Sequence, residues 1–246
     1  MPRGRRHFLP GYVWHITHRC HKKEFLLKFA RDRRLWMTWL FEARKRYGLS
    51  ILNYVATSNH IHLLVLDRGE RGVISRSMQL VSGRTAQAFN IRKKRKGAFW
   101  EDRYHATAVD TDHHLASCMT YIDLNMVRAG VVKHPSEWES GGYAELLTDR
   151  ERNPILDHGS ILEFLGADSI EALRRLRGEW VRGAIARNDL VRESKWTESV
   201  AVGNKGFVET VKTKLGLRAK GRRISGREHD FTLREPQDLF GGGCDA

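Results

Sequence analysis

Apolar and polar residues alternate near the start of the chain and then change to a helical spacing. Residues 12–19 alternate one by one, which is typical of a strand with one face in a core. Residues 31–47 instead carry apolar side chains at four-residue spacing with Arg and Lys between them, and Gly48 follows where a left-handed cap would end a helix. The pattern therefore predicts a strand followed by an amphipathic helix.

Further strands and helices are expected up to about residue 130. In chain order the pattern predicts a strand at 50–56, a turn at 57–59 that leads into a third strand, a helix at 73–91, a strand at 99–109 and a helix at 113–127. Asp110 and Thr111 can cap the last helix, and Gly130 can end it. This order predicts an α+β fold, with a ferredoxin-like antiparallel sheet that carries its helices on one face.

A mixed polar stretch between Pro135 and Pro154 indicates a boundary in the chain. We expect one domain over residues 1–150, followed by a small, mostly helical accessory region over 151–216. Residues 217–246 are rich in Arg and Lys and end near a run of glycines, which favours a loose basic tail. No internal repeat is visible.

The charge of the chain predicts what kind of partner it binds. Its 246 residues are 41% hydrophobic, enough for a core, and carry a formal net charge of +14 with a pI near 10.0. Neutralised phosphates release condensed counterions, so a protein this basic is attracted to nucleic acid. An anionic membrane is the alternative, but the basic runs do not lie on a Trp-rich amphipathic helix, so we expect no membrane partner.

Cysteine usage and the start of the chain indicate a compartment. Cys20, Cys118 and Cys244 are isolated and lack C-x-x-C spacing, which argues against a disulfide framework and against a structural zinc site. Met1–Leu9 is basic without a following apolar stretch, and no segment approaches about 18 uninterrupted apolar residues. We therefore expect a cytoplasmic, nucleoid-associated protein.

Two histidines at the start of the third expected strand are the first candidates for chemistry. His60 and His62 are two residues apart, so in an extended strand both imidazoles project from one face toward one point. Composition alone produces about 0.6 such pairs in this chain, so the spacing is weak by itself. The apolar run at 63–66 marks a buried strand and supports a site at its end, while an ordinary structural pair remains the alternative.

Tyr121 and Asn125 are the second candidate pair. They lie four residues apart on the last expected helix and share a face, from which a hydroxyl and an amide oxygen could approach one metal ion. A lone tyrosine on such a helix is more often a core aromatic. Taken together with the two histidines, the pair indicates a metal site beside a tyrosine nucleophile.

Three motifs that follow one another along the chain suggest a family. They are N-H-I-H-L-L-V at 59–65, F-W-E-D-R-Y at 99–104 and Y-I-D-L-N-M-V-R-A-G-V-V at 121–132. In this order and spacing they resemble the single-tyrosine HUH transposases, and most closely the REP-associated tyrosine transposases, from about residue 3 to about residue 147. Met126 stands where the family usually has Pro, and Thr57-Ser58 stand where Met-Pro or Met-Ser is common. Neither departure falls on a residue with chemistry to perform.

The resemblance implies a function and a set of roles. It implies a metal-dependent single-stranded DNA endonuclease and strand transferase that acts on hairpin-forming, REP-like repeats, as a monomer or homodimer. Tyr121 would form a 5′-phosphotyrosine and leave a free 3′-OH, which keeps the bond energy for rejoining. His60, His62 and Asn125 would be the metal ligands, the last because the family places an amide or carboxylate there. Such ligands suit Mg²⁺ or Mn²⁺, with Mn²⁺ favoured by imidazole, and the choice stays open.

A basic run with aromatic residues beside it predicts DNA contacts. Residues 92–96, followed by Phe99, Trp100 and Tyr104, combine phosphate-binding charge with rings on which exposed bases can stack. A solvated charge run beside a buried ring is the alternative, in which case the basic termini would hold the DNA. The residues that we assign to nucleic acid are Arg5, Arg6, Arg92, Lys93, Lys94, Arg95, Lys96, Trp100, Arg103, Tyr104 and Arg128.

Glu101 and Asp102 compete with the histidines as metal ligands, because carboxylates are common in nuclease metal sites. As adjacent residues of an expected strand they would face opposite sides, so we interpret them as ion-pair partners beside Arg103.

Two other functions are alternatives for the whole chain. A catalytically silent, domesticated DNA- or RNA-binding protein is disfavoured because the two histidines, the tyrosine and the asparagine are all present. An HUH replication initiator or relaxase is disfavoured because 246 residues leave little room for a helicase or a longer accessory domain.

Overall fold

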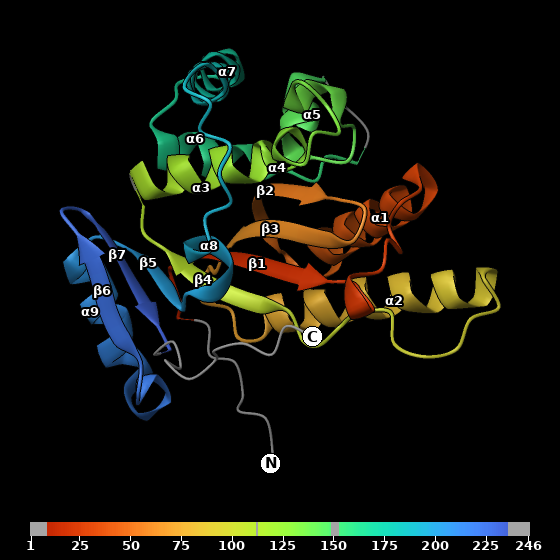
Figure 1. The fold of residues 1–246 in the computed structure, drawn as a ribbon, viewed down its shortest axis with the longest axis horizontal. Coiled ribbons are helices and arrows are strands. Elements are labelled where there is room, and N and C mark those ends of the chain that lie inside the picture. The colour runs from red at the N-terminus through yellow and green to blue at the C-terminus, as the bar shows by residue number, and fades with distance from the viewer. Residues whose placement is uncertain (1–8, 112, 149–152, 236–246) are drawn as a thin grey trace, which may run out of the picture.

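The computed structural model describes residues 9–111, 113–148 and 153–235. A mixed sheet runs through it, and the strands found among these residues are ordered β2-β3-β1-β4-β5-β7-β6 (Figure 1). The strands are β1 (Val13–Arg19), β2 (Ser50–Ala56), β3 (His60–Leu66), β4 (His105–Val109), β5 (Ala201–Gly203), β6 (Arg223–Arg227) and β7 (Asp230–Arg234).

Helices cover this sheet. They are α1 (Ala30–Tyr47), α2 (Val73–Arg92), α3 (His113–Asp123), α4 (Asn125–Arg128), α5 (Gly142–Leu147), α6 (His158–Leu165), α7 (Ile170–Ala186), α8 (Lys195–Glu198) and α9 (Lys205–Leu215), with short 3-10 turns at His21–Lys23, Pro135–Glu137 and Gly216–Ala219. Within the described ranges, no helix is both long enough and apolar enough to cross a membrane.

The first four strands form the predicted ferredoxin-like core. They are mutually antiparallel in the order β2-β3-β1-β4, and the chain runs β1-α1-β2-β3-α2-β4 through them. The expected α+β class is thereby confirmed. Local periodicity located these elements well, since β2 has the predicted bounds and α2 extends one residue beyond them.

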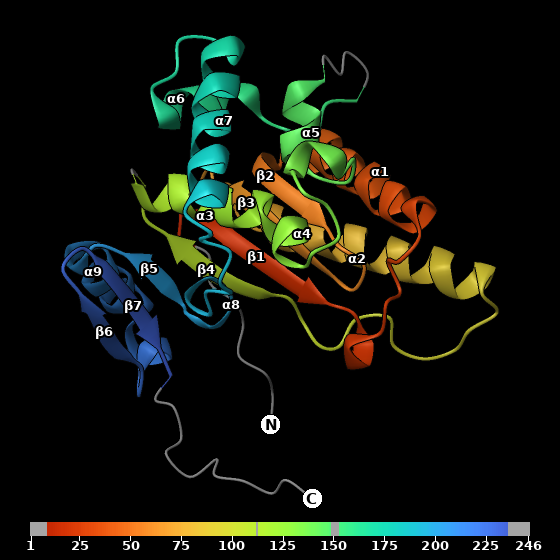
Figure 2. The ribbon, with the colours of Figure 1, turned by 45° about the horizontal axis from the view of Figure 1, so that its top comes forward.

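Helices lie on both faces of the core sheet, so its covering is fuller than the single helical face that we expected. Neighbouring strand residues face opposite sides. On β1 the His15 ring lies 6.3 Å from the Tyr121 ring of α3, centroid to centroid, whereas His18 Nδ1 lies 3.3 Å from the Ser82 hydroxyl of α2. Figure 2 shows α3 on one side of the sheet and α2 on the other. The centre of β3 is buried accordingly, with His62 as its polar member before the apolar run at 63–66.

Two elements begin or end where the sequence pattern did not place them. The strand expected from 99 is interrupted: Trp100 forms an isolated bridge with Cys20, and β4 starts only at His105. Between them the His18 side chain binds the backbone, since its Nε2 donates to the Asp102 carbonyl at 2.7 Å. The helix expected over 113–127 breaks at Leu124 into α3 and α4. At this break the Arg128 guanidinium donates to the Tyr121 carbonyl at 3.2 Å.

The C-terminal part of the chain extends the same sheet. β5 pairs in parallel with β4, and the β6–β7 hairpin follows it antiparallel. Residues 223–234, which we expected to be part of a loose tail, are therefore strands; β6 is largely exposed and too short to show a clear apolar alternation. Residues 236–246 lie outside the described part of the chain, and the domain boundaries at 150 and 216 stay predictions.

A buried ion pair joins α7 of this extension to α3. The Arg177 guanidinium donates to both carboxylate oxygens of Asp123, at 2.6 and 2.7 Å, and Asn53 Nδ2 donates to the same carboxylate at 2.9 Å. Both charged side chains are at most 2% exposed. Burial raises the pKa of Asp123, and the Arg177 charge opposes that effect. The pair thus fixes the helix that carries Tyr121.

We predict that Arg177→Met lowers the free energy of unfolding by about 3–5 kcal/mol, because the Asp123 carboxylate would be left buried without its cation. The matched control is the double variant Asp123→Leu/Arg177→Met, which removes both charges and should lose much less. Urea unfolding followed by circular dichroism measures both. Equal losses in the two variants would contradict the role of the charge pair.

Candidate active site

A cavity of about 740 Å³ opens at one end of the strands of the core sheet. The last residues of β1 and the first residues of β3 line it. The 101–103 segment, the α3–α4 break and residues 192–198 complete its wall. Its basic lining residues are Arg19, Lys23, Arg103, Arg128 and Arg192, and its acidic ones are Glu101, Asp102 and Glu198. The cavity is therefore suited to an anionic ligand.

The four residues singled out for chemistry all line this cavity. His60 and His62 project from one face of β3, as their spacing predicted, with ring centroids 5.0 Å apart. Tyr121 comes from the end of α3 and Asn125 from the start of α4. The structure thus brings them together across more than sixty residues of sequence, while their roles stay predictions.

Both histidines present an unprotonated nitrogen to the cavity side of the site. His60 Nδ1 lies 2.7 Å from Asn59 Oδ1, which can only accept, so Nδ1 carries the proton and Nε2 keeps its lone pair. The Asn125 amide donates to His62 Nε2 at 2.9 Å, so that nitrogen also holds a lone pair. Lone pairs on two neighbouring imidazoles are what a metal ion requires.

Burial keeps these imidazoles neutral. It lowers the pKa of His60 to about 4, and the nearby Arg19 adds to the effect. Burial first, and then the charges of His60 and His15, hold the pKa of His62 well below its ordinary value. The ligands would therefore not have to lose protons before binding a cation at neutral pH.

Tyr121 is held beside a cation. Its side chain is 5% exposed, and burial raises the pKa of its hydroxyl, an effect that Arg128 opposes. The Arg128 guanidinium carbon lies 4.3 Å from the centre of the tyrosine ring, and the His62 ring is edge-on at 5.8 Å. A fixed positive charge stabilises a phenolate, so Arg128 is placed to help Tyr121 act as a nucleophile.

The donor set fits a divalent cation if Asn125 takes part. In the described part of the chain, no group of three or more His, Cys, Asp or Glu could hold a metal ion, so the third protein ligand at this site would have to be the amide. An amide offers either its NH₂ or its oxygen after a half turn. His60, His62 and Asn125 would then supply two nitrogens and one oxygen, as Mn²⁺ accepts.

The basic loop at 92–96 is not uniform. Lys93, Lys94 and Lys96 are exposed. Arg92 pairs with Asp32 in the first turn of α1, and Arg95 pairs with Glu24 before α1 at 3.5 Å, so both arginines hold the loop against the start of α1 and the segment before it. The three lysines are the loop residues best placed to reach a phosphate.

The aromatic residues assigned to DNA are less accessible than expected. Phe99 is only 2% exposed, and Trp100 is half-buried, stacked on His18 with centroids 4.2 Å apart. Tyr104 lies edge-on to the same histidine. Arg103 and Arg128 do line the cavity. Arg5 and Arg6 lie outside the described residues.

Sequence reasoning missed several residues of this region. Glu101 and Asp102 were expected to face opposite sides of a strand, but both line the cavity, because they lie in a bend where the alternation of a strand does not hold. Phe25 and Phe29 are 66% and 57% exposed, and Lys93 lies over the Phe29 ring with Nζ 5.6 Å from its centre. Nothing in their sequence distinguishes these phenylalanines from core residues. Arg192 was missed because it lies far along the chain.

The chain is similar to known transposases. Residues 11–125 match the model of the family described as IS200-like transposase. No curated protein matches the chain. The solved structure of a REP-associated tyrosine transposase bound to a REP hairpin is similar with a TM-score of 0.51 and 19% identity, over 63% of this chain and 90% of that one, which shows a shared fold. A second solved structure, of a protein from Deinococcus radiodurans R1, matches with a TM-score of 0.34 and 15% identity, over 48% and 91% of the two chains, too weakly to support an argument.

We predict that the protein without metal loses stability as the pH falls from about 6.5 to about 4. The unfolded chain binds protons on its histidines in this range while His60 and His62 stay neutral in the fold, so the free energy of unfolding falls by up to about 1.4 kcal/mol per pH unit for each. Denaturant unfolding in EDTA at several pH values measures the slope. His60→Ala/His62→Ala should have a flatter slope, and an unchanged slope would contradict the assignment.

Proposed function

We propose that the protein is a metal-dependent single-stranded DNA endonuclease and strand transferase, a function supported by the match of residues 11–125 to the family described as IS200-like transposase. It would act on hairpin-forming repeats through a 5′-phosphotyrosine intermediate. The observation that carries the proposal is the meeting of Tyr121, His60, His62 and Asn125 in one cavity with a basic lining. The match to the family model supports the transposase class, and the residues of the cavity support the metal and the covalent intermediate.

The residues of the cavity divide the chemistry among them. Tyr121 would lose its phenolic proton and attack the scissile phosphate; a tyrosine–phosphate bond forms, the bond to the 3′ oxygen breaks, and that oxygen takes up a proton. Arg128, stacked on the tyrosine ring, would stabilise negative charge on the phenolate and on the phosphate. A divalent cation held by His60, His62 and Asn125 would polarise the phosphate and withdraw charge from the leaving oxygen. The covalent bond keeps the energy needed to rejoin strands.

A hairpin-forming single strand is the substrate that the fold and the charge support best. The similar solved structure is that of a transposase bound to a REP hairpin. This chain shares its fold and has a net charge of +14. A nucleotide that flanks a hairpin is unpaired, so its phosphate backbone can enter a cavity that a duplex could not enter.

An exposed surface beside the cavity suits the unpaired bases. Phe25, Phe29, Lys93, Lys94 and Lys96 form this aromatic–lysine surface. An exposed apolar patch rimmed by polar side chains marks a binding site more often than a single exposed residue does. Rings next to lysines fit single-stranded nucleic acid, whose bases stack while its phosphates pair with the charges. Lys23, two residues before Phe25, lines the cavity and connects the two regions.

We predict that Tyr121→Phe abolishes DNA cleavage and the covalent adduct, with a loss of at least about 10³-fold, while hairpin binding persists. Only the attacking oxygen is removed, so the fold and the charged surface stay intact. A denaturing gel of labelled single-stranded hairpin DNA incubated with Mn²⁺ detects the adduct. EDTA should remove the adduct from the unchanged protein.

An adduct that survives in Tyr121→Phe would assign the nucleophile to another residue. Hairpin binding without any adduct in the unchanged protein, at any divalent metal tried, would instead support the catalytically silent alternative.

We predict that two variants of the aromatic–lysine surface weaken binding in different ways. Phe25→Ala/Phe29→Ala should cost about 1–3 kcal/mol per stacked base without changing the dependence on salt, because stacking releases no counterions. Lys93→Gln/Lys94→Gln/Lys96→Gln should flatten the log–log salt slope by about 0.7 for each phosphate that a lysine no longer neutralises. Fluorescence anisotropy of a single strand at several salt concentrations measures both effects.

Lys205→Gln is the control for these two variants of the aromatic–lysine surface. Lys205 is exposed on α9, at the opposite end of the molecule from the loop after α2 (Figure 1). An equal change of slope in this control would show that the lysines act through net charge alone.

A further inference from the structure

A second buried histidine, His15, binds the ring nitrogen of His62 that does not face Asn125. His15 on β1 is fully buried, and its Nε2 lies 2.9 Å from His62 Nδ1. The two rings are nearly parallel, with centroids 5.0 Å apart. The other nitrogen of His15, Nδ1, lies 2.9 Å from the main-chain carbonyl of Trp196.

The Trp196 carbonyl determines which atom is the donor in each of these hydrogen bonds. A carbonyl only accepts, so His15 Nδ1 carries the proton and His15 Nε2 is left with a lone pair. His62 Nδ1 must then donate to His15, which leaves the lone pair of His62 on Nε2, the nitrogen that faces Asn125. The tautomer of His62 is thereby set by a backbone group more than 130 residues away in sequence.

Without His15, the other tautomer of His62 becomes available. A proton on Nε2 could then be donated to the oxygen of Asn125 after a half turn of the amide. The Asn125 oxygen would then accept the His62 proton instead of facing a metal ion, and the lone pair of His62 would point away from the cavity. Hydrogen bonds made by the outer nitrogen of a ligating histidine are known to fix its tautomer in this way.

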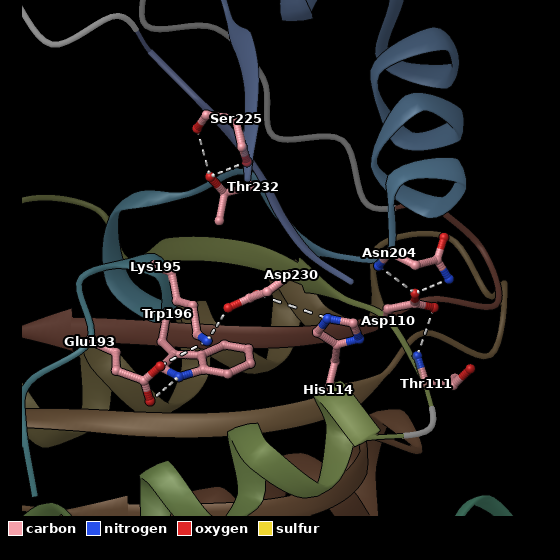
Figure 3. Close-up of polar contacts among 10 residues, drawn as sticks. All are labelled: Asp110, Thr111, His114, Glu193, Lys195, Trp196, Asn204, Ser225, Asp230 and Thr232. Atoms are coloured by element: carbon pink, nitrogen blue, oxygen red, sulfur yellow. Dashed lines mark hydrogen bonds and ion pairs between the residues drawn. The ribbon is translucent and has the colours of Figure 1, made fainter. Parts of the chain in front are cut away.

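Trp196 is itself anchored from several sides. It is fully buried, and its indole Nε1 donates to Glu193 at 3.1 Å. Lys195 bridges Glu193 and Asp230, at 2.8 and 2.7 Å, which ties α8 to the β6–β7 hairpin (Figure 3). His114 at the start of α3 lies 3.9 Å from the same aspartate. The Trp196 carbonyl, which accepts the hydrogen bond from His15, therefore has a fixed position.

The neighbouring backbone is anchored as well. The Thr107 hydroxyl on β4 donates to the Ser199 carbonyl at 2.6 Å, and His105 Nε2 binds the same carbonyl at 2.8 Å. Residues 193–199 are thus attached both to the core sheet and to its C-terminal extension.

We infer that His15 is a positioning residue for His62, and that residues 193–199, which lie beyond the part of the chain matched by the family model, set the tautomer and orientation of His62 through the Trp196 carbonyl. The inference deepens the proposed function, on which its consequence for metal binding rests. It gives the C-terminal extension a part in the chemistry of the cavity.

Three substitutions of His15 separate this role from packing. A glutamine can place its amide oxygen near the position of Nε2 and still accept from His62. An asparagine places its amide near Nδ1, where it can donate to Trp196 but not reach His62. A phenylalanine fills the space and makes neither hydrogen bond. Thermal unfolding by circular dichroism checks that each variant is folded.

Two measurements report on His62 directly. Nitrogen-15 NMR of the imidazoles in the metal-free protein shows which nitrogen of His62 carries the proton. Electron paramagnetic resonance of free Mn²⁺ during titration gives the affinity for the metal. We expect His15→Phe and His15→Asn to mix the tautomers of His62 and to weaken Mn²⁺ binding by about 10-fold or more, whereas His15→Gln should retain the Nδ1–H tautomer and most of the affinity.

An unchanged His62 tautomer and unchanged Mn²⁺ affinity in His15→Phe would overturn the inference and make His15 a packing residue. If the unchanged protein binds no Mn²⁺, the proposed metal site fails, and the NMR signals still decide whether His15 sets the tautomer. Should the His15 variants fail to fold, Lys195→Met loosens the anchor of Trp196 from a distance; an ordered, unshifted His62 in that variant would equally overturn the inference.

Discussion

The hydrogen bond between the buried imidazoles of His15 and His62 is the contact on which the arrangement of the cavity depends. Buried polar atoms without partners cost free energy, and a cluster of them persists only when each one is satisfied. Here the Trp196 carbonyl, His15, His62 and the Asn125 amide satisfy one another in sequence, with each hydrogen bond at 2.9 Å. This chain of hydrogen bonds joins the extension, two central strands and the α3–α4 break, so none of them can move independently of the proposed metal ligands.

The break at Leu124 shapes the wall of the cavity that Tyr121, Asn125 and Arg128 line. It places Arg128 where its guanidinium binds the Tyr121 carbonyl and stacks on the tyrosine ring. Met126 stands in the first turn of α4, where the resembled family usually has proline. Backbone N–H groups of a first turn lack helical partners, so either residue is compatible with a helix that restarts there. Asp123, two residues from Tyr121, is held instead by Arg177, which fixes the helix without occupying the cavity.

Local patterns in the sequence predicted the ferredoxin-like core, because alternation and four-residue spacing depend only on near neighbours. They also predicted that His60 and His62 share a face and that Tyr121 lies near Asn125, which the structure shows, although their roles are untested. The strand expected from residue 99 is interrupted, because Trp100 pairs with Cys20 only as an isolated bridge and the His18 side chain binds the backbone at Asp102 before β4 begins. The hydrogen bond of His15 with Trp196 spans 181 residues and leaves no periodic signal. Exposure of Phe25 and Phe29 likewise depends on the whole fold.

The extension beyond the matched family region is part of the cavity and not an appendage to it. Arg192, Thr197 and Glu198 line the cavity, and β5 pairs with β4 along the edge that the four-stranded core would otherwise leave open. Removing it would expose the His15 Nδ1 proton and the Thr107 hydroxyl, whose acceptors are the Trp196 and Ser199 carbonyls. The extension therefore does two things at once: it satisfies buried donors of the core, and it adds an ion pair, Arg192 with Glu198 at 3.8 Å, to the wall of the cavity.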